Sequence, residues 1–147
     1  MSQIDVHTEA QMPASADAVR SALQDYATVR PRILTDEYRE YRVLEGGTGD
    51  GTVAAWTLQA TKKRSRDVIA DVDVTTDGDV VERDRNSTLV TTWTAKPLSD
   101  RTSTVKIHTT WQGSGGVGGF FEKTFAPNGM RAIHARVLNK LAEEVRD

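Results

Sequence analysis

The chain has 147 residues, with 19 Lys and Arg against 21 Asp and Glu, a formal net charge of −2, and no cysteine. This charge balance gives no general attraction to nucleic acid or to an anionic membrane, and the lack of cysteine excludes disulfides and thiolate chemistry. There is neither an apolar run of membrane-spanning length nor a signal-peptide pattern at the first residues. We therefore expect one cytoplasmic domain over residues 1–147.

The N-terminal part predicts one strand and two short helices. Apolar and polar residues alternate over 4–12, which is the pattern of a half-buried strand. Ser15 is a good N-cap for the helix that follows, in which Ala16, Val19, Leu23 and Tyr26 share one face. A second short helix is expected around residues 29–34, with Pro31 in its first turn.

The middle of the chain predicts consecutive antiparallel strands joined by turns. The expected strands are 38–45, 52–61, 67–74, 80–85, 89–95 and 104–111. The clearest alternation places Val68, Ala70, Val72 and Val74 on one face and Asp67, Asp71 and Asp73 on the other, which we interpret as the solvent face. The dipeptide Asp77-Gly78 is a hairpin signal.

The C-terminal part predicts a glycine-rich segment followed by a long amphipathic helix. Met130, Ile133, Val137, Leu141 and Val145 recur at spacings of three and four residues. Because proline cannot continue a helix from residues 122–125 without a kink, we expect a short Phe-rich helix, a break at 127–129, and then the long helix. The glycines at 113–119 do not match a phosphate loop, so they are interpreted as the hinge of a lid.

Local phrases and element order together resemble a known family. The phrases are MPASADAV at 12–19, YRVLEGGTGDGT at 41–52 and WQGSGGVGGFFE at 111–122, the last followed by FAPNG at 125–129. The chain resembles the START-related helix-grip superfamily (SRPBCC), and within it the polyketide cyclase/dehydrase and lipid-transport family. The resemblance covers nearly all the chain and implies an α+β fold. In that fold a curved antiparallel sheet of about seven strands surrounds a long C-terminal helix, with two short helices after the first strand.

The resemblance also implies a cavity between sheet and helix that holds a lipid, polyketide or other apolar molecule. Apolar pockets are lined mainly by aromatic and aliphatic side chains, with a few polar groups that orient the ligand. Each tryptophan could instead fill the core, and each inward threonine could simply suit its strand. Tyr41 is a further polar candidate. The predicted lining is Trp56, Leu58, Gln59, Thr91, Trp93, Ile107, Thr109, Trp111, Phe120, Phe121, Met130, Ile133 and Val137.

The three histidines are interpreted as surface or edge residues, and no metal or cofactor is expected. His7 and His108 occupy polar positions of the first and last strands, which are neighbours in the related fold, so they can form an exposed pair. No histidine has a metal-binding partner at helical spacing. The candidate acid–base residues are Tyr41, Arg42 and His134, the last only if it turns into the hollow.

Three functions remain open at this point. The first is binding or carriage of a small hydrophobic ligand, lipid or polyketide-like. The second is an aromatase/cyclase-type enzyme, which needs an acid–base group inside the hollow. The third is an accessory protein that docks on a membrane or partner through the basic turn at 62–66 and through Phe120 and Phe121. A nucleic-acid partner is not expected, and both a monomer and a dimer remain open.

Overall fold

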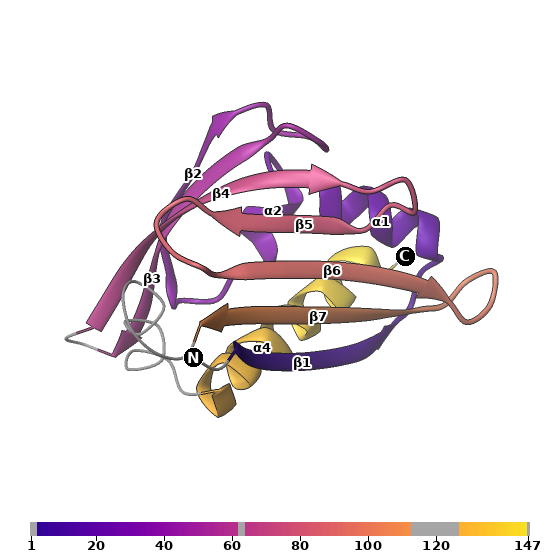
Figure 1. Cartoon of the computed structure of the whole chain (residues 1–147). Helices are drawn as coiled ribbons and strands as arrows, with labels where there is room; N and C mark the ends of the chain where they lie inside the picture. The colour runs from indigo at the N-terminus through magenta and orange to yellow at the C-terminus, as the bar shows by residue number, and fades with distance from the viewer. Residues whose placement is uncertain (1–2, 62–63, 113–126, 147) are drawn as a thin grey trace.

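The computed structural model describes residues 3–61, 64–112 and 127–146, and these form a curved antiparallel sheet with helices on one face (Figure 1). The sheet has seven strands in the order β1-β7-β6-β5-β4-β3-β2. The elements are β1 (Gln3–Met12), α1 (Ala16–Gln24), α2 (Val29–Ile33), β2 (Tyr38–Glu45), β3 (Val53–Thr61), β4 (Arg64–Val74), β5 (Val80–Asp84), β6 (Val90–Pro97), β7 (Ser103–Gln112) and α4 (Pro127–Val145). The predicted α+β helix-grip architecture is confirmed.

The first and last strands are neighbours, as expected. β1 pairs with β7 along its whole length, from Gln3 opposite Gln112 to Met12 opposite Ser103. His7 lies directly opposite His108, and their rings stack with centroids 4.1 Å apart. The predicted exposed histidine pair is therefore confirmed.

The core lies between the inner face of the sheet and the apolar stripes of the helices. The alternation in β4 buries Val68, Ala70 and Val72, and the alternation in β7 buries every second residue from Val105 to Trp111. Helix α4 contributes Met130, Ile133, His134, Val137, Leu138 and Leu141. Full burial of an aliphatic side chain stabilises a fold by about 1.5–3 kcal/mol, so these two surfaces hold α4 across the sheet.

Helix α4 begins at Pro127, three residues before the expected start at Met130. The sequence prediction of a break at 127–129 is wrong, because these residues form the first turn of the helix. Proline suits that turn, since its missing N–H would have no partner within the helix. The predicted Phe-rich helix and the glycine hinge lie outside the described residues.

The outer face of the sheet carries the aspartates of β4, as predicted. Asp71 pairs with Arg85 at 2.8 Å, and Asp73 pairs with Arg83 at 2.6 Å. Both pairs are about half exposed, so they contribute solubility more than stability. None of the helices in the described part of the chain is long and apolar enough to cross a membrane.

Candidate ligand-binding site

A small hollow lies between the inner face of the sheet and the first turns of α4. It is lined by Arg30, Leu34, Tyr38, Trp56, Leu58, Glu82, Leu89, Thr91, Trp93, Met130 and His134. Its volume is about 30 Å³, which is on the scale of a water molecule. The site is therefore small, with apolar and polar side chains meeting in one place.

A glycine turn between β2 and β3 positions the segment that carries Tyr26 and Arg30. The Gly47 carbonyl accepts hydrogen bonds from the backbone N–H groups of Tyr26 and Ala27, at 2.9 and 3.1 Å. Gly47 has φ +140° and Gly46 has φ +69°, conformations that side chains disfavour. The turn thus holds the chain between α1 and α2 so that Tyr26 and Arg30 point at the sheet.

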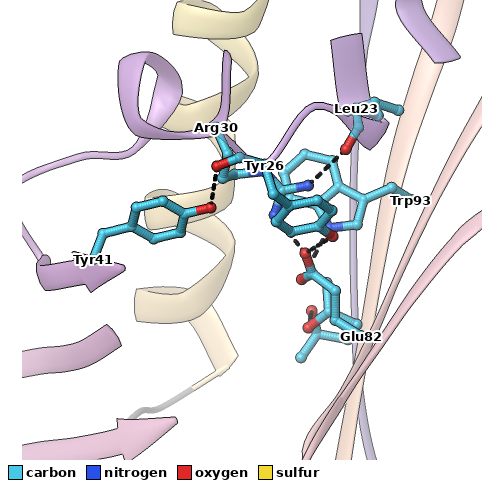
Figure 2. Close-up of polar contacts among 8 residues, drawn as sticks. Leu23, Tyr26, Arg30, Tyr41, Glu82 and Trp93 are labelled. Carbon is cyan, nitrogen blue, oxygen red and sulfur yellow. Dashed lines mark hydrogen bonds and ion pairs between the residues drawn. The ribbon is translucent and has the colours of Figure 1, made fainter. Parts of the chain in front are cut away.

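Arg30 and Glu82 form a buried ion pair at one wall of the hollow (Figure 2). Glu82 Oε2 accepts from Arg30 and also from the Tyr26 hydroxyl at 2.5 Å, and its Oε1 accepts from Trp93 Nε1 at 3.2 Å. The Arg30 guanidinium lies over the rings of Tyr26 and Trp93, at 4.2 and 4.6 Å from their centroids, and donates to the Leu23 carbonyl. Both carboxylate oxygens are therefore occupied.

This arrangement fixes the charge of the buried wall. Burial would lower the pKa of Arg30, but the neighbouring Tyr26 and Glu82 raise it, so the guanidinium stays charged. Burial raises the pKa of the Tyr26 hydroxyl well above its usual value, so Tyr26 remains a proton donor toward Glu82. The charges of this wall therefore compensate each other, and most of its hydrogen-bonding groups already have partners.

The other wall combines apolar side chains with polar atoms that have no partner. Trp56, Leu58, Leu89 and Met130 supply the apolar surface. Trp56 Nε1 and His134 Nδ1 are buried without a hydrogen bond to any described residue. A buried polar group without a partner costs about 1–3 kcal/mol. These two nitrogens face the hollow, whereas Arg30 Nε at the opposite wall and Trp111 Nε1 in the core are likewise unpaired among the described residues.

His134 is buried, and the expectation of a surface or edge position is wrong. Its side chain is 3% exposed and lines the hollow. The residue lies four positions after Met130 and four before Leu138, so it completes the apolar face of α4. Burial lowers the pKa of His134 to about 4, so the imidazole is neutral at physiological pH.

The predicted lining residues divide into two groups in the structure. Trp56, Leu58, Thr91, Trp93 and Met130 line the hollow. A second group is buried in the adjacent core and does not line the hollow: Ile107, Thr109, Trp111, Ile133 and Val137.

Of the polar candidates, Gln59 does not line the hollow and Thr109 lies behind it. Gln59 is only partly buried and accepts from Arg39 at 3.3 Å. The Thr91 and Thr109 hydroxyls bond each other at 3.2 Å, so Thr109 supports a lining residue. Phe120 and Phe121 lie outside the described residues.

The candidate acid–base residues on β2 have other roles. The Tyr41 hydroxyl donates to the Tyr26 carbonyl at 2.6 Å, so Tyr41 positions the buried wall without lining the hollow (Figure 2). Arg42 is exposed and donates to the Glu40 carbonyl at 2.9 Å, so it is not an acid–base group of this site.

Sequence reasoning missed the ion pair and several lining residues. Glu82 shares the inward parity of Val80 on β5, and Arg30 lies three residues before the buried Ile33 on α2. Each of the two charged residues therefore occupies a position whose spacing from a buried apolar residue indicates burial, and this was the available signal for the pair. Leu34 and Tyr38 gave no separate signal, whereas Leu89 shares its parity with Thr91 and Trp93.

A curved antiparallel sheet with a long C-terminal helix across it and a hollow between them defines a helix-grip protein. The family model described as polyketide cyclase / dehydrase and lipid transport matches residues 3–146, so the chain belongs to this family. The NMR solution structure of KanY protein (ms6282) is 52% identical, with 99% of each chain covered and a TM-score of 0.88.

More distant solved structures share the fold alone. The Zhui aromatase/cyclase from Streptomyces sp. R1128 is 16% identical over 99% of this chain and 97% of that one, with a TM-score of 0.72. The ginseng major latex-like protein 151 from Panax ginseng is 10% identical over 97% of each chain, with a TM-score of 0.73. None of the curated proteins matches the chain.

Proposed function

We propose that the protein binds a small, uncharged, mainly apolar molecule, lipid or polyketide-like, in the hollow between the sheet and α4. The observation that carries this proposal is the wall of Trp56, Leu58, Leu89, Met130 and His134, in which Trp56 Nε1 and His134 Nδ1 have no partner in the described ranges 3–61, 64–112 and 127–146. Sites for small molecules combine such apolar walls with a few placed polar groups.

The chemistry of the lining favours a neutral ligand with at least one oxygen. Arg30 and Glu82 neutralise each other, and His134 is uncharged at pH 7, so the described lining residues offer no unpaired charge for an ion. The indole N–H of Trp56 is a donor only and requires an acceptor. A carbonyl or phenolic oxygen meets that requirement, whereas a hydrocarbon leaves the N–H unsatisfied.

The hollow must widen to admit such a ligand, because its volume of about 30 Å³ is far smaller than a lipid or polyketide-like molecule. Met130 is the side chain best suited to move. It lies in the first turn of α4 and lines the hollow, and its unbranched thioether adopts several rotamers at low cost. We expect ligand entry to displace Met130 from its closed position.

Calorimetry with a matched pair of probes tests this proposal. 1-Naphthol and naphthalene share a bicyclic ring, but only 1-naphthol carries an oxygen. We expect saturable 1:1 binding of 1-naphthol, at least tenfold tighter than naphthalene, because naphthalene leaves Trp56 Nε1 without a partner. Native mass spectrometry of the purified protein would identify a ligand carried from the cell. Absence of binding for both probes, with no co-purified ligand, would contradict the proposal.

A second candidate, an aromatase/cyclase-type enzyme, is favoured by two titratable groups in the same hollow. Burial raises the pKa of the Tyr38 hydroxyl, so it remains a proton donor, and Tyr38 lines the hollow. His134, in the tautomer protonated at Nε2, offers its Nδ1 lone pair as a base. Together they could remove a proton from the carbon beside a ketone and protonate its oxygen, which yields an enol.

Deuterium exchange separates the two candidates. 1-Tetralone has the size of 1-naphthol and an exchangeable C2 position. The enzyme hypothesis expects NMR to detect accelerated C2 exchange that is lost in Tyr38→Phe and in His134→Leu. The binding hypothesis expects 1-tetralone to bind with its exchange rate unchanged.

A further inference from the structure

Three potential metal ligands meet on the outer face of the sheet, where the first and last strands pair. His7 and His108 are direct cross-strand partners with rings stacked at 4.1 Å, and Asp5 lies two residues before His7 on the same face. Asp5 Oδ1 is 2.8 Å from His108 Nε2. One ligand atom from each of the three residues lies within 4.8 Å of the other two.

We propose that Asp5, His7 and His108 form a surface site for a divalent transition-metal ion, for which Zn²⁺ is the reference. Two imidazoles and one carboxylate are a donor set that suits Zn²⁺ and Cu²⁺, whereas Mg²⁺ and Ca²⁺ require oxygen ligands. Water would complete the coordination on the solvent side. The proposal does not depend on the ligand hollow, which lies on the opposite face of the sheet.

Joint coordination requires the two stacked rings to tilt so that their nitrogen lone pairs converge on one ion. Zn–N bonds of about 2.0–2.1 Å in a tetrahedral site place ligand atoms about 3.3 Å apart. The Asp5–His108 contact already has that scale, and the remaining separations must shorten from at most 4.8 Å. Asp5 and His7 are exposed and His108 is about one-third exposed, so their rotamers can adjust without repacking the core.

Local charges set the affinity of this site. The hydrogen bond from His108 lowers the pKa of Asp5, so the carboxylate is ionised. Burial, then His108 and Lys106, lower the pKa of His7, which leaves a neutral imidazole available at pH 7. The positive charges of Lys106 and of Arg131, on α4, lower the pKa of His7 and oppose a bound metal ion, whereas Glu9, opposite Lys106 on β1, carries a negative charge that offsets part of them. We therefore expect micromolar rather than nanomolar binding.

The sequence alone does not predict this site, because no histidine has a metal-binding partner at helical spacing. His7 and His108 lie at opposite ends of the sheet-forming sequence, and only the β1–β7 register makes them neighbours. The predicted histidine pair was correct, but Asp5 had no motif that connected it to His108.

Titration calorimetry of the full chain, without an affinity tag and after dialysis against a chelator, tests the site. We expect one Zn²⁺ per chain with a micromolar Kd, tighter binding of Cu²⁺ in line with the general affinity order, and no heat from Mg²⁺. Asp5→Asn, His7→Gln and His108→Gln should each weaken Zn²⁺ binding at least tenfold. Asp71→Asn, an exposed carboxylate on the same sheet, is the matched control and should leave the Kd unchanged.

NMR of the imidazole resonances supplies a second readout. Zn²⁺ should shift the signals of His7 and His108 and leave those of the buried His134 in place. The proposal is overturned if Zn²⁺ gives no saturable 1:1 binding. It is equally overturned if binding survives His7→Gln or His108→Gln unchanged, because the ion would then lie elsewhere. Since these residues are on the surface, thermal midpoints of the variants should match the wild type and exclude misfolding as the cause.

Discussion

The two walls of the hollow differ in how their buried polar groups are satisfied. On one wall, both Glu82 oxygens accept hydrogen bonds, from Arg30, Tyr26 and Trp93. On the other, Trp56 Nε1 and His134 Nδ1 have no partner among the described residues. Buried polar groups are normally hydrogen-bonded, and on the first wall Arg30 Nε is the exception among the described side-chain atoms, so folding accounts for most of that wall. The second wall is where a ligand has bonds left to make.

Removal of the Glu82 carboxylate should have the largest effect on stability. Glu82→Ala leaves the buried Arg30 charge without its counterion, and we expect the free energy of unfolding to fall by about 3–5 kcal/mol. The double variant Arg30→Met with Glu82→Leu should recover most of this loss, because an apolar pair leaves no uncompensated charge. Urea unfolding measures both. A loss below about 1 kcal/mol for Glu82→Ala would mean that the wall does not depend on the pair.

Truncation of Met130 should separate an effect on ligand affinity, expected at the hollow, from an effect on stability, expected throughout the core. Met130→Ala and Leu141→Ala both remove a buried side chain of α4, so each should lower the free energy of unfolding by about 2–5 kcal/mol. Only Met130→Ala enlarges the hollow, so only this variant should bind 1-naphthol more tightly than the wild type. Equal effects of the two variants on affinity would refute a role for Met130 in ligand entry.

The wall that carries His134 should also make the free energy of unfolding depend on pH. The pKa of His134 is about 4 in the fold against 6.5 for an ordinary histidine. Between these values the unfolded chain binds a proton that the folded chain excludes, so stability falls as the pH decreases from about 6.5 to about 4. The His134 contribution to this loss is about 3 kcal/mol. Urea unfolding from pH 7.5 to pH 4 should show a smaller decrease for His134→Leu than for the wild type. Parallel pH profiles would contradict the burial of a neutral imidazole.

Loss of an exposed ion pair on the outer face of the sheet should change the free energy of unfolding least. Asp71→Asn breaks the pair with Arg85, whose two side chains are 45% and 48% exposed. Solvent screens such pairs and replaces their hydrogen bonds, so we expect no resolvable change in the urea midpoint. A loss comparable to that of Glu82→Ala would show that burial does not determine the strength of ion pairs in this protein.

Periodicity predicted the fold because each strand and helix has one buried face. The alternation of β4 and the stripe from Met130 to Leu141 placed their core residues correctly. The same rule failed for His134, since a polar residue at the margin of a stripe was assigned to the surface although its spacing from Met130 and Leu138 is helical. Periodicity alone does not show whether packing and hydrogen bonds compensate for the desolvation of a polar side chain.

The ion pair and the size of the hollow depend on contacts that local sequence does not contain. Arg30 and Glu82 lie on α2 and β5, and they meet because the glycine turn after β2 holds Tyr26 in place. Their inward parity was visible, but their pairing was not. The volume of the hollow is set by how the side chains of six different elements pack, which no single-strand pattern determines. That the lining residues bind a ligand remains a prediction.

The most direct test of the difference between the two walls is a comparison of Trp56→Phe with Trp93→Phe. Both variants remove an indole N–H, but Trp93 Nε1 donates to Glu82 whereas Trp56 Nε1 has no partner within the described part of the chain. Urea unfolding and 1-naphthol calorimetry should be measured on each. We predict that Trp93→Phe destabilises the fold by about 1–3 kcal/mol more than Trp56→Phe, and that Trp56→Phe alone weakens 1-naphthol binding about tenfold with naphthalene unaffected. Equal losses of stability and affinity in the two variants would contradict the division into a structural wall and a ligand-binding wall.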